Sequence, residues 1–377
     1  MGRLAAMDFG FSDQQEQLKA QVRRFLDSEC PLERVRQIMS SRDAHDTALW
    51  TKIAGLGWPA LAIEEQHGGL GLAWEDLIVV AEEAGRTLFP SPLLASAVAA
   101  RAIGTLGSER QKGRWLPAIA SGETIATLAV LEESDDLSEA GVETVAEASG
   151  EQIVLNGTKM FVGYGQSAQL LLVAAREKGG TSLFAVASDA AGVTVTPQRL
   201  VDQTSRVAQI SLEGVVVDAA DRLGEPGAAW SDIAKVLDAG TVAMSAEMVG
   251  AADAACRLAT EYAKVRKQFG QPIGKFQGVK HKLAEIFVDI ESARSLVYFA
   301  SWAVDHLPDA RGHVSMAKAY ASQALDRAGE ECIQIHGAIG YTWECDAHLY
   351  YKRGRYCRNL AGSPEYHHER LLAAQGL

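Results

Sequence analysis

The sequence predicts an α+β protein of three consecutive domains. We expect an N-terminal α-helical domain over residues 1–123, a central small β-barrel or sandwich over 124–227, and a C-terminal four-helix bundle over 228–377. Apolar residues recur at helical spacing up to about residue 120 and again from Trp230, whereas short β-branched runs about ten residues apart lie between them. A chain of 377 residues is also long for a single core.

The first domain reads as consecutive amphipathic helices. The earliest begins near Phe11, where Ser12 and Gln15 have the spacing of a capping box, and Pro31 interrupts it. A helix at 74–88 is expected to carry Glu82 and Glu83 on a polar, solvated face. The other expected helices are 47–56, 93–106 and 111–119.

The middle domain is marked by a change of period near Thr124. Asn156-Gly157 lies between two β-rich runs and predicts a hairpin turn at that point. The expected strands are 124–130, 153–155, 159–162, 170–173, 183–186, 193–195 and 215–217. Helical periodicity then returns in three long, Ala-rich segments at 230–265, 275–306 and 314–335, which suit a bundle.

The composition narrows the classes of partner. A net charge of −12 and a pI near 5.3 argue against nucleic acid and against an anionic membrane surface, although the basic cluster at 352–355 could bind a small anion. We find neither a membrane-spanning run nor the core of a signal peptide, and Met7 looks like a natural start. The five cysteines show no CxxC spacing, so we expect reduced thiols, no metal site and a cytoplasmic protein.

The most informative stretch is 262–284, in which two helices are joined by a Gly-Pro turn. Arg266, Gln268 and Gln277 supply planar donors around the aromatic Phe269. A guanidinium and amides beside an aromatic ring suit a diphosphate attached to a flat ring system.

Residues 266–277, RKQFGQPIGKFQ, resemble the RxQFGxPIxxFQ signature of the acyl-CoA dehydrogenase family. QIHGAIGY at 334–341 resembles its QxxGGxGY signature, and GLGW at 55–58 with HGGLG at 67–71 resembles its N-terminal pattern. The resemblance covers nearly the whole chain. It implies the acyl-CoA dehydrogenase fold, FAD as cofactor, and α,β-dehydrogenation of an acyl-CoA thioester, with an electron-transfer flavoprotein as electron acceptor.

The resemblance also implies which residues hold FAD across a subunit boundary. Ala338 stands where the family has a second glycine, and Phe161 and Gly163 stand where it has a WIT triplet. Residues 131–136 do not match the family's TEPxxGSD loop. We expect the carboxylates of this segment to repel a flavin diphosphate. The cofactor-binding positions carried over are Arg266, Gln268, Phe269, Ile273, Gln277, Gln334, Gly337, Ala338, Phe161 and Gly163.

Both family positions for the catalytic base lack a carboxylate, since they correspond to Ala361 and Gly240. Glu247 lies seven residues after Gly240, on nearly the same helix face and in an apolar run, so it is the candidate base and is expected to have a raised pKa if buried. The alternative is that Glu247 pairs with a basic side chain. The polar cluster at 202–204 is expected to form a turn or an interdomain ion pair.

Three functions remain open at this point. The divergent positions resemble a bacterial branch whose members act as α2β2 heterotetramers on bulky acyl-CoAs such as steroid side chains. The chain could instead form a homotetrameric enzyme with Glu247 as base, or a non-catalytic structural subunit that completes the FAD site of a homologous partner. Because both usual base positions are empty, we expect the isolated chain to be a poor dehydrogenase.

Overall fold

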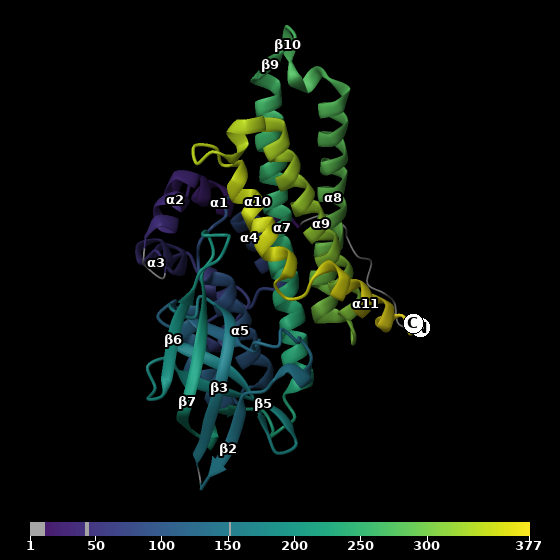
Figure 1. The fold of residues 1–377 in the computed structure, drawn as a ribbon. Coiled ribbons are helices and arrows are strands. Elements are labelled where there is room, and N and C mark those ends of the chain that lie inside the picture. Colours follow the sequence, from purple (N-terminus) through teal and green to yellow (C-terminus); the bar gives the residue numbers. More distant parts are fainter. Residues whose placement is uncertain (1–11, 42–44, 151) are drawn as a thin grey trace.

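The computed structural model describes residues 12–41, 45–150 and 152–377, so the predicted start at Met7 lies outside the described residues. Helices form the first part of the chain, a β-sheet the middle and long helices the last part (Figure 1), which confirms the predicted fold class. The first helices are α1 (Asp13–Glu29), α2 (Leu32–Ser40), α3 (Thr47–Gly55), α4 (Trp74–Arg86), α5 (Leu93–Leu106) and α6 (Glu109–Ala120).

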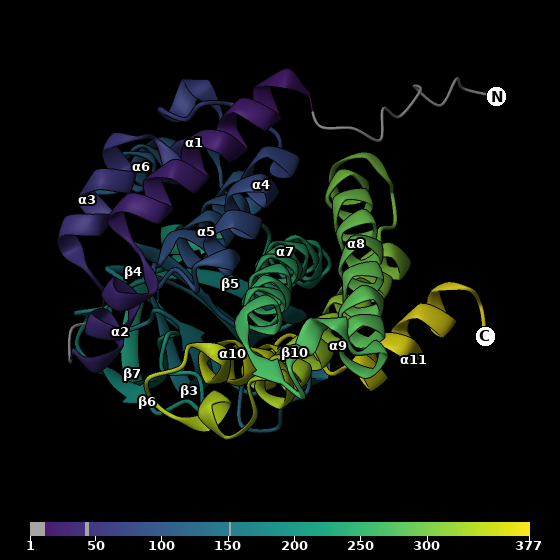
Figure 2. The ribbon, with the colours of Figure 1, turned by 90° about the horizontal axis from the view of Figure 1, so that it is seen from above.

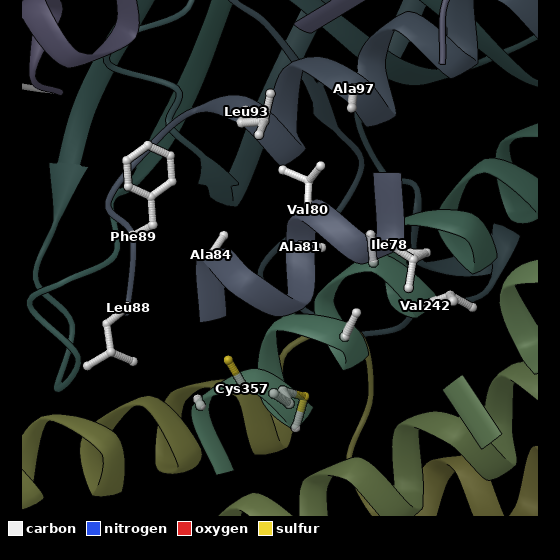
Figure 3. Packing of buried hydrophobic residues seen from close by; sticks show 14 of the residues in the cluster. Ile78, Val80, Ala81, Ala84, Leu88, Phe89, Leu93, Ala97, Val242 and Cys357 are labelled. Carbon is white, nitrogen blue, oxygen red and sulfur yellow. The ribbon is translucent and has the colours of Figure 1, made fainter. Parts of the chain in front are cut away.

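Local signals set the ends of these helices. Ser12 and Gln15 form the predicted capping box of α1, in which each side chain accepts from the other's backbone N–H. The segment between α4 and α5 holds two prolines, and there Leu88 and Phe89 turn into the core (Figure 3). This turn brings α4 and α5 against the long helix α7 (Trp230–Val265), with Val242 of α7 in the same apolar cluster.

The middle of the chain forms one eight-stranded mixed sheet in the order β6-β7-β3-β2-β4-β5-β8, with β1 paired in parallel to β4. The sheet lies in front of α5 and beside the lower end of α7 (Figure 1). Its strands are β1 (Ala126–Ala129), β2 (Val145–Ser149), β3 (Gln152–Gly163), β4 (Leu170–Glu177), β5 (Gly180–Ala187), β6 (Val193–Gln198), β7 (Val207–Asp218) and β8 (Arg222–Leu223).

The hairpin predicted at Asn156-Gly157 is wrong. β3 runs through both residues, and its register against β7 shifts between Leu155 and Gly157, which is a β-bulge. Gly157 has φ 154°, and a Cβ there would lie 2.4 Å from Oγ1 of Thr144, so only glycine fits. Asn156 Oδ1 accepts a 2.7 Å hydrogen bond from the backbone N–H of Gly214. Between these paired positions Asn156 faces two residues of β7, Glu213 and Gly214, so the extra residue of the bulge lies on β7.

The C-terminal part is a bundle around α7 (Trp230–Val265), whose bounds match the prediction. Viewed from above, α7 stands between the N-terminal helices and α8 (Figure 2). At its upper end a two-stranded ribbon, β9 (Lys267–Gln268) and β10 (Gln271–Pro272), leads into α8 (Figure 1). The remaining helices are α8 (Gln277–His306), α9 (Arg311–His336), α10 (Ala347–Asn359) and α11 (Pro364–Ala374).

The helices α4 and α7 touch through their backbones. A Cβ on Gly85 would lie 1.9 Å from the carbonyl oxygen of Glu247, and a Cβ on Gly250 would lie 1.8 Å from that of Glu82. Both glycines are therefore required for this approach. The contact fixes the height and rotation of α7 at Glu247 against the N-terminal helices.

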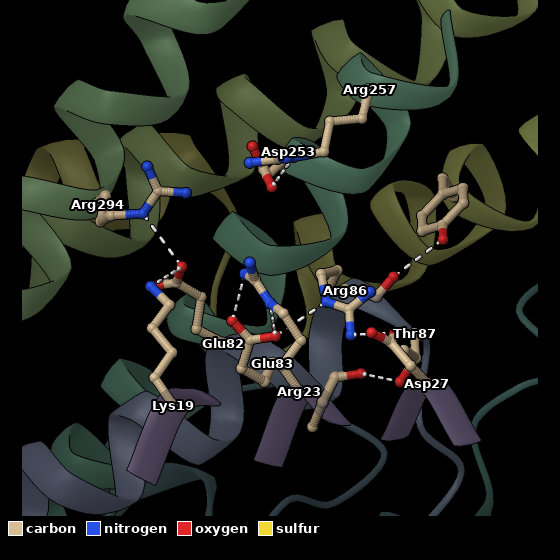
Figure 4. A network of polar contacts seen from close by, with 12 residues as sticks. Lys19, Arg23, Asp27, Glu82, Glu83, Arg86, Thr87, Asp253, Arg257 and Arg294 are labelled. Carbon is tan, nitrogen blue, oxygen red and sulfur yellow. Dashed lines mark hydrogen bonds and ion pairs between the residues drawn. The ribbon is translucent and has the colours of Figure 1, made fainter. Parts of the chain in front are cut away.

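The prediction that Glu82 and Glu83 form a solvated face is wrong, because their relative exposures are 4% and 1%. Glu82 accepts hydrogen bonds from Lys19, Arg294 and Tyr298, and Glu83 from two arginines (Figure 4). The arginines Arg23 and Arg86 help to hold the pKa of Glu83 below its usual value, although burial opposes them. The carboxylates of Glu82 and Glu83 are thus buried, together with their hydrogen-bond donors, where α1, α4 and α8 meet.

Candidate active site

A cavity of about 330 Å³ lies where α5, α7, α10 and α11 meet the ends of β1 and β3. Most of its lining is apolar, and the α7 residues that face it span Ala234 to Glu247. With a rise of about 1.5 Å per residue, they line the cavity over about 20 Å of helix. The apolar walls include Leu94, Val98, Leu128, Met160, Leu237 and Met244. A groove of this shape suits an elongated, largely apolar ligand.

Glu247 lines this cavity together with Gly240 and Ala361. The three positions considered for a base therefore face one space. The carboxylate of Glu247 has no hydrogen-bond or ion-pair partner among the described residues. Burial raises the pKa of Glu247 to about 7, while the charge of Arg353 lowers it and that of Asp202 raises it.

Arg353 of α10 is buried beside Glu247 and pairs with the β domain. Its Nε donates to Asp202 Oδ2, and its Nη2 donates to Thr204 Oγ1 over 2.7 Å. Burial opposes the charge of Arg353, but Asp202 keeps its pKa above the usual value. The interdomain ion pair expected at 202–204 is confirmed.

The basic cluster at 352–355 is not a free anion site. Arg353 is only 3% exposed, Arg355 pairs with Glu330 and Asp326, and Lys352 lies 4.5 Å from the ring centre of Trp343. The sequence could not distinguish these paired cations from a solvated basic patch, because their partners are distant in the chain.

The segment after α10 carries Ala361 into the cavity. Ala361 has φ 56°, and its carbonyl oxygen lies 2.9 Å from Nε2 of His367, which also lines the cavity. Lys318 of α9 is fully buried and donates to the carbonyl oxygens of Cys357, Arg358 and Gly362. Burial lowers the pKa of Lys318 to about 8. These bonds fix the position of a backbone whose left-handed residue would otherwise be disfavoured.

The opposite end of the cavity is also polar. Asp238 of α7 and Arg370 of α11 form an ion pair of 2.7 Å, and both line the cavity. Burial raises the pKa of Asp238, and Arg370 opposes that shift. The cavity therefore has polar groups at both ends and apolar walls between them.

Phe161 and Gly163, the two ring-side positions, both line the cavity. A second register shift in β3, between Lys159 and Val162, accompanies the left-handed φ of 52° at Phe161. The backbone N–H of Phe161 donates to Gln198 Oε1, and the carbonyl oxygen of Gly163 accepts a bond of 2.7 Å from Thr127 Oγ1. The bulge thus turns an aromatic side chain toward the cavity.

The segment 131–136 differs from the expected run of repelling carboxylates. Glu132 points inward, forms a 2.5 Å ion pair with the fully buried Lys159, and accepts from the backbone N–H groups of Glu143 and Thr144. Burial lowers the pKa of Lys159 to about 8, although Glu132 counteracts this. The expectation was wrong for Glu132, while Asp136 does line the cavity.

The residues of the RKQFG stretch lie at the far end of α7, outside this cavity. Arg266 follows Glu247 by 19 residues, which is about 28 Å along the helix axis. Arg266, Gln268 and Gln277 are exposed, and Phe269 is 91% exposed at the tip of the ribbon. Ile273 is half-buried and packs against the main apolar core. No described side chain pairs with the guanidinium of Arg266.

Gln334, Gly337 and Ala338 line a second cavity of about 480 Å³ at the same end of the bundle. Gly337 has φ 67° and ψ −144°, and a Cβ there would meet no atom within 4 Å. Its backbone is therefore open on the side where a ligand could approach. The rings of Tyr262 and His336 stack 4.3 Å apart and join the end of α7 to the end of α9.

Several cavity residues were not predicted as site residues. Tyr164 has a left-handed φ of 51° and lines the cavity near Glu247, and Arg353, His367 and Arg370 come from the last helices. Strain at Tyr164 marks a position that the surrounding structure enforces. No motif in the sequence identifies these residues, because they meet only through packing of distant segments.

Three family models match the chain. They are "Acyl-CoA dehydrogenase, N-terminal domain" over residues 12–123, the middle domain of the same family over 129–215, and its C-terminal domain over 227–376. Among curated proteins, the probable acyl-CoA dehydrogenase YngJ of Bacillus subtilis is 33% identical over 78% of this chain and 80% of its own length. Acyl-CoA dehydrogenase IpdE2 of Mycobacterium tuberculosis is 31% identical over 88% and 87%.

Solved structures give the same picture. A chain of the ChsE4-ChsE5 complex from Mycobacterium tuberculosis superposes with a TM-score of 0.91 at 28% identity, covering 98% of this chain and 99% of that one. Butyryl-CoA dehydrogenase from Megasphaera elsdenii gives 0.91 at 26% identity, covering 98% and 100%. Within the described residues no helix has the length and apolarity to cross a membrane, and no three His, Cys, Asp or Glu side chains gather as metal ligands.

Proposed function

Because the chain belongs to the acyl-CoA dehydrogenase family, we propose that it catalyses FAD-dependent α,β-dehydrogenation of an acyl-CoA thioester with Glu247 as the base. One observation supports the choice of Glu247 as the base. Glu247 is an unpaired carboxylate that lines the same cavity as the two family base positions, Gly240 and Ala361.

The chemistry requires a carboxylate over the α-carbon, since the thioester makes the α-hydrogen weakly acidic. A base works best when its pKa lies near the working pH, and burial brings the pKa of Glu247 to about 7. The apolar walls exclude water from the acyl chain, and Gly240 packs so closely against Val98 that a Cβ there would lie 3.1 Å from Val98 Cγ2. FAD supplies the acceptor for the β-hydrogen as hydride.

The residues at the far end of the bundle fit the diphosphate and adenine of FAD. Arg266 is an exposed guanidinium without a partner among the described residues, and Gly337 offers open backbone beside Gln334. Gln268 and Gln277 add exposed amide donors close to Arg266 in the sequence. Since Glu247 lies about 28 Å away along α7, these residues are proposed to serve the site of a neighbouring subunit.

Arg266→Ala is expected to weaken FAD binding by about 2–3 kcal/mol, the range of a hydrogen bond to a charged group. That corresponds to a loss of roughly 30- to 150-fold in affinity, measured as flavin retained after dialysis and by fluorescence titration. Arg257→Ala is the matched control, because Arg257 is an exposed arginine of α7, the helix that ends just before Arg266, and pairs only with Asp253 in the described chain. Equal flavin content in both variants would contradict the assignment.

The proposed sharing of FAD requires an oligomer. Large apolar side chains are exposed on the upper half of the bundle, including Val265, Phe269, Phe287 and Val288. Exposed apolar side chains grouped in this way are typical of subunit interfaces. The partner is a second copy or a homologous subunit, and an electron-transfer flavoprotein is the proposed acceptor.

The free thiols of all five cysteines suit a reducing compartment such as the cytoplasm.

Phe287→Glu is expected to dissociate the oligomer and release flavin, because it places a charge at an exposed apolar position of the proposed interface. Sedimentation velocity at micromolar concentration measures the assembly. Val145→Glu, on an exposed position of the sheet, is the control and should leave it intact. A wild-type protein that sediments as a monomer with FAD bound would rule the shared site out.

A second candidate function is that of a structural subunit that completes the FAD site of a homologous partner. It is favoured by Asp136, which lines the cavity in the segment where the family has its TEPxxGSD loop. Turnover of acyl-CoAs by the isolated chain and by mixtures with homologous subunits distinguishes the two. Bulky acyl groups, including steroid side chains, are the substrates to test first, since Gly240 and Ala361 leave space where the family has a carboxylate.

A further inference from the structure

We propose that the buried ion pair of Asp202 and Arg353 positions opposed charges beside Glu247 and so sets the pH at which Glu247 can accept the substrate proton. The inference rests on the proposed function, in which Glu247 is the base. It makes Asp202 and Arg353 positioning residues that act through Glu247 without contacting the reacting atoms.

The geometry places the pair between the cavity and the β domain. Arg353 lines the cavity with Glu247, whereas Asp202 lies behind it and is 1% exposed. Asp202 is fully bonded, since its two carboxylate oxygens accept from Arg353, the N–H and hydroxyl of Thr204, and the hydroxyl of Ser205. These hydrogen bonds fix the positions of both charged groups, so their electrostatic effect on Glu247 is not reduced by side-chain motion.

The other groups around Glu247 contribute little charge. Burial raises the pKa of Tyr164, Tyr356 and Cys357, so all three stay neutral at physiological pH. Arg206 is charged, but it is not among the groups that shift the pKa of Glu247, and its guanidinium donates to backbone carbonyls of Gln203, Ser205, Ile38 and Met39.

The remaining neighbours lie on α4 and α9. On the α4 side Glu247 meets the backbone of Gly85, and the nearby Glu82 and Glu83 are bonded to other cations. Lys318 of α9 lies behind Cys357 and binds carbonyl oxygens. Arg353 and Asp202 are the charged groups that shift the pKa of Glu247.

The two charges act in opposite directions. Arg353 favours the ionised form of Glu247 and is the stronger influence, whereas Asp202 favours the protonated form. Removing Asp202 alone leaves an unbalanced guanidinium, so the pKa of Glu247 should fall. Removing both should raise it, because only burial then remains. A purely structural pair would not produce shifts of opposite sign.

The test uses full-length protein with Asp202→Asn, with Asp202→Asn/Arg353→Met, and with Thr204→Val. The last variant loses hydrogen bonds to both members of the pair without changing charge. The protonation of Glu247 is followed by infrared difference spectroscopy of its carboxyl band, assigned with Glu247→Gln. The pH dependence of kcat/KM for an acyl-CoA is measured in parallel.

We expect the Asp202→Asn midpoint to move to lower pH by roughly one unit, the double variant to move to higher pH, and Thr204→Val to lose stability without a shift. If Asp202→Asn does not fold, the double variant decides alone, because it leaves no unpaired buried charge. An unchanged midpoint in the double variant, or shifts of the same sign in both, would overturn the inference.

The two readouts separate this inference from the proposed function. If the infrared midpoints move as expected but Glu247→Gln retains full turnover, the electrostatic role stands and Glu247 is not the base. If Glu247→Gln abolishes turnover and no midpoint moves, Glu247 is the base and the pair does not tune it.

Discussion

Replacement of Glu247 by glutamine is expected to lower kcat/KM for acyl-CoA oxidation by about 10²- to 10⁴-fold, the usual contribution of a positioned general base. Glutamine keeps the size and polarity of the side chain but cannot accept the α-proton. Turnover with a ferrocenium-type acceptor measures the effect. Glu75→Gln is the matched control, because Glu75 is a partly buried glutamate of α4 that lies outside the cavity and whose pKa is also raised by burial.

Glu247 should also link activity to pH and to stability. Its carboxyl must be ionised to act, so kcat/KM should rise with pH through about 7. The folded state raises this pKa above the ordinary value of 4.5, so burial of the ionised carboxylate costs stability at higher pH. The Glu247→Gln variant should therefore unfold at a higher temperature than wild type at pH 8. That difference should shrink as the pH falls below 7 and vanish below about pH 4.5.

Two outcomes would revise the proposal. Full turnover by Glu247→Gln would mean that the base comes from elsewhere, and a homologous partner would be the first place to look. Negligible turnover by the isolated wild-type chain that is restored by a partner would favour the heteromeric enzyme. Full turnover by the isolated wild-type chain, abolished in Glu247→Gln, would exclude dependence on a partner.

Lys159→Met is expected to destabilise the protein by about 3–5 kcal/mol, the cost of leaving one member of a buried ion pair without its partner. Glu132 would then remain buried at 6% exposure with only backbone donors around it. Urea unfolding at pH 7 measures the loss. Lys264→Met removes an exposed pair with Glu261 and should cost less than about 1 kcal/mol.

A double variant tests the physical reason. Lys159→Met combined with Glu132→Gln should recover part of the lost stability, because no uncompensated charge stays buried. A loss below about 1 kcal/mol in Lys159→Met alone would show that Glu132 is protonated or reaches water.

The sequence could predict what depends on local pattern. The period of α7 alone gave its bounds at Trp230 and Val265, and the seven-residue spacing of Gly240 and Glu247 put both on the face that meets the cavity. Asn156-Gly157 misled because the dipeptide lies inside β3 opposite a bulge of β7, and its pairing depends on that neighbouring strand. The domain boundaries at 123/124 and 227/228 stay a prediction.

Partnerships across long separations could not be predicted. Arg353 and Asp202 are 151 residues apart, and Glu82 and Arg294 are 212 apart. Composition shows only that cations and carboxylates are present, and their burial depends on how helices from both ends of the chain pack. The roles assigned to the FAD residues also stay predictions until the flavin experiments are done.

The backbone contact of α4 with α7 has a consequence for motion. With Gly85 against the carbonyl of Glu247 and Gly250 against that of Glu82, α7 cannot slide or rotate locally without separating from α4. Opening of the helix at this point therefore requires disruption of the core, and its amide protons should exchange with solvent only as slowly as the whole protein unfolds. Any motion that admits a substrate must therefore occur in the other walls of the cavity, which include α11 and the segment 131–137. Glu247 stays fixed while those walls move.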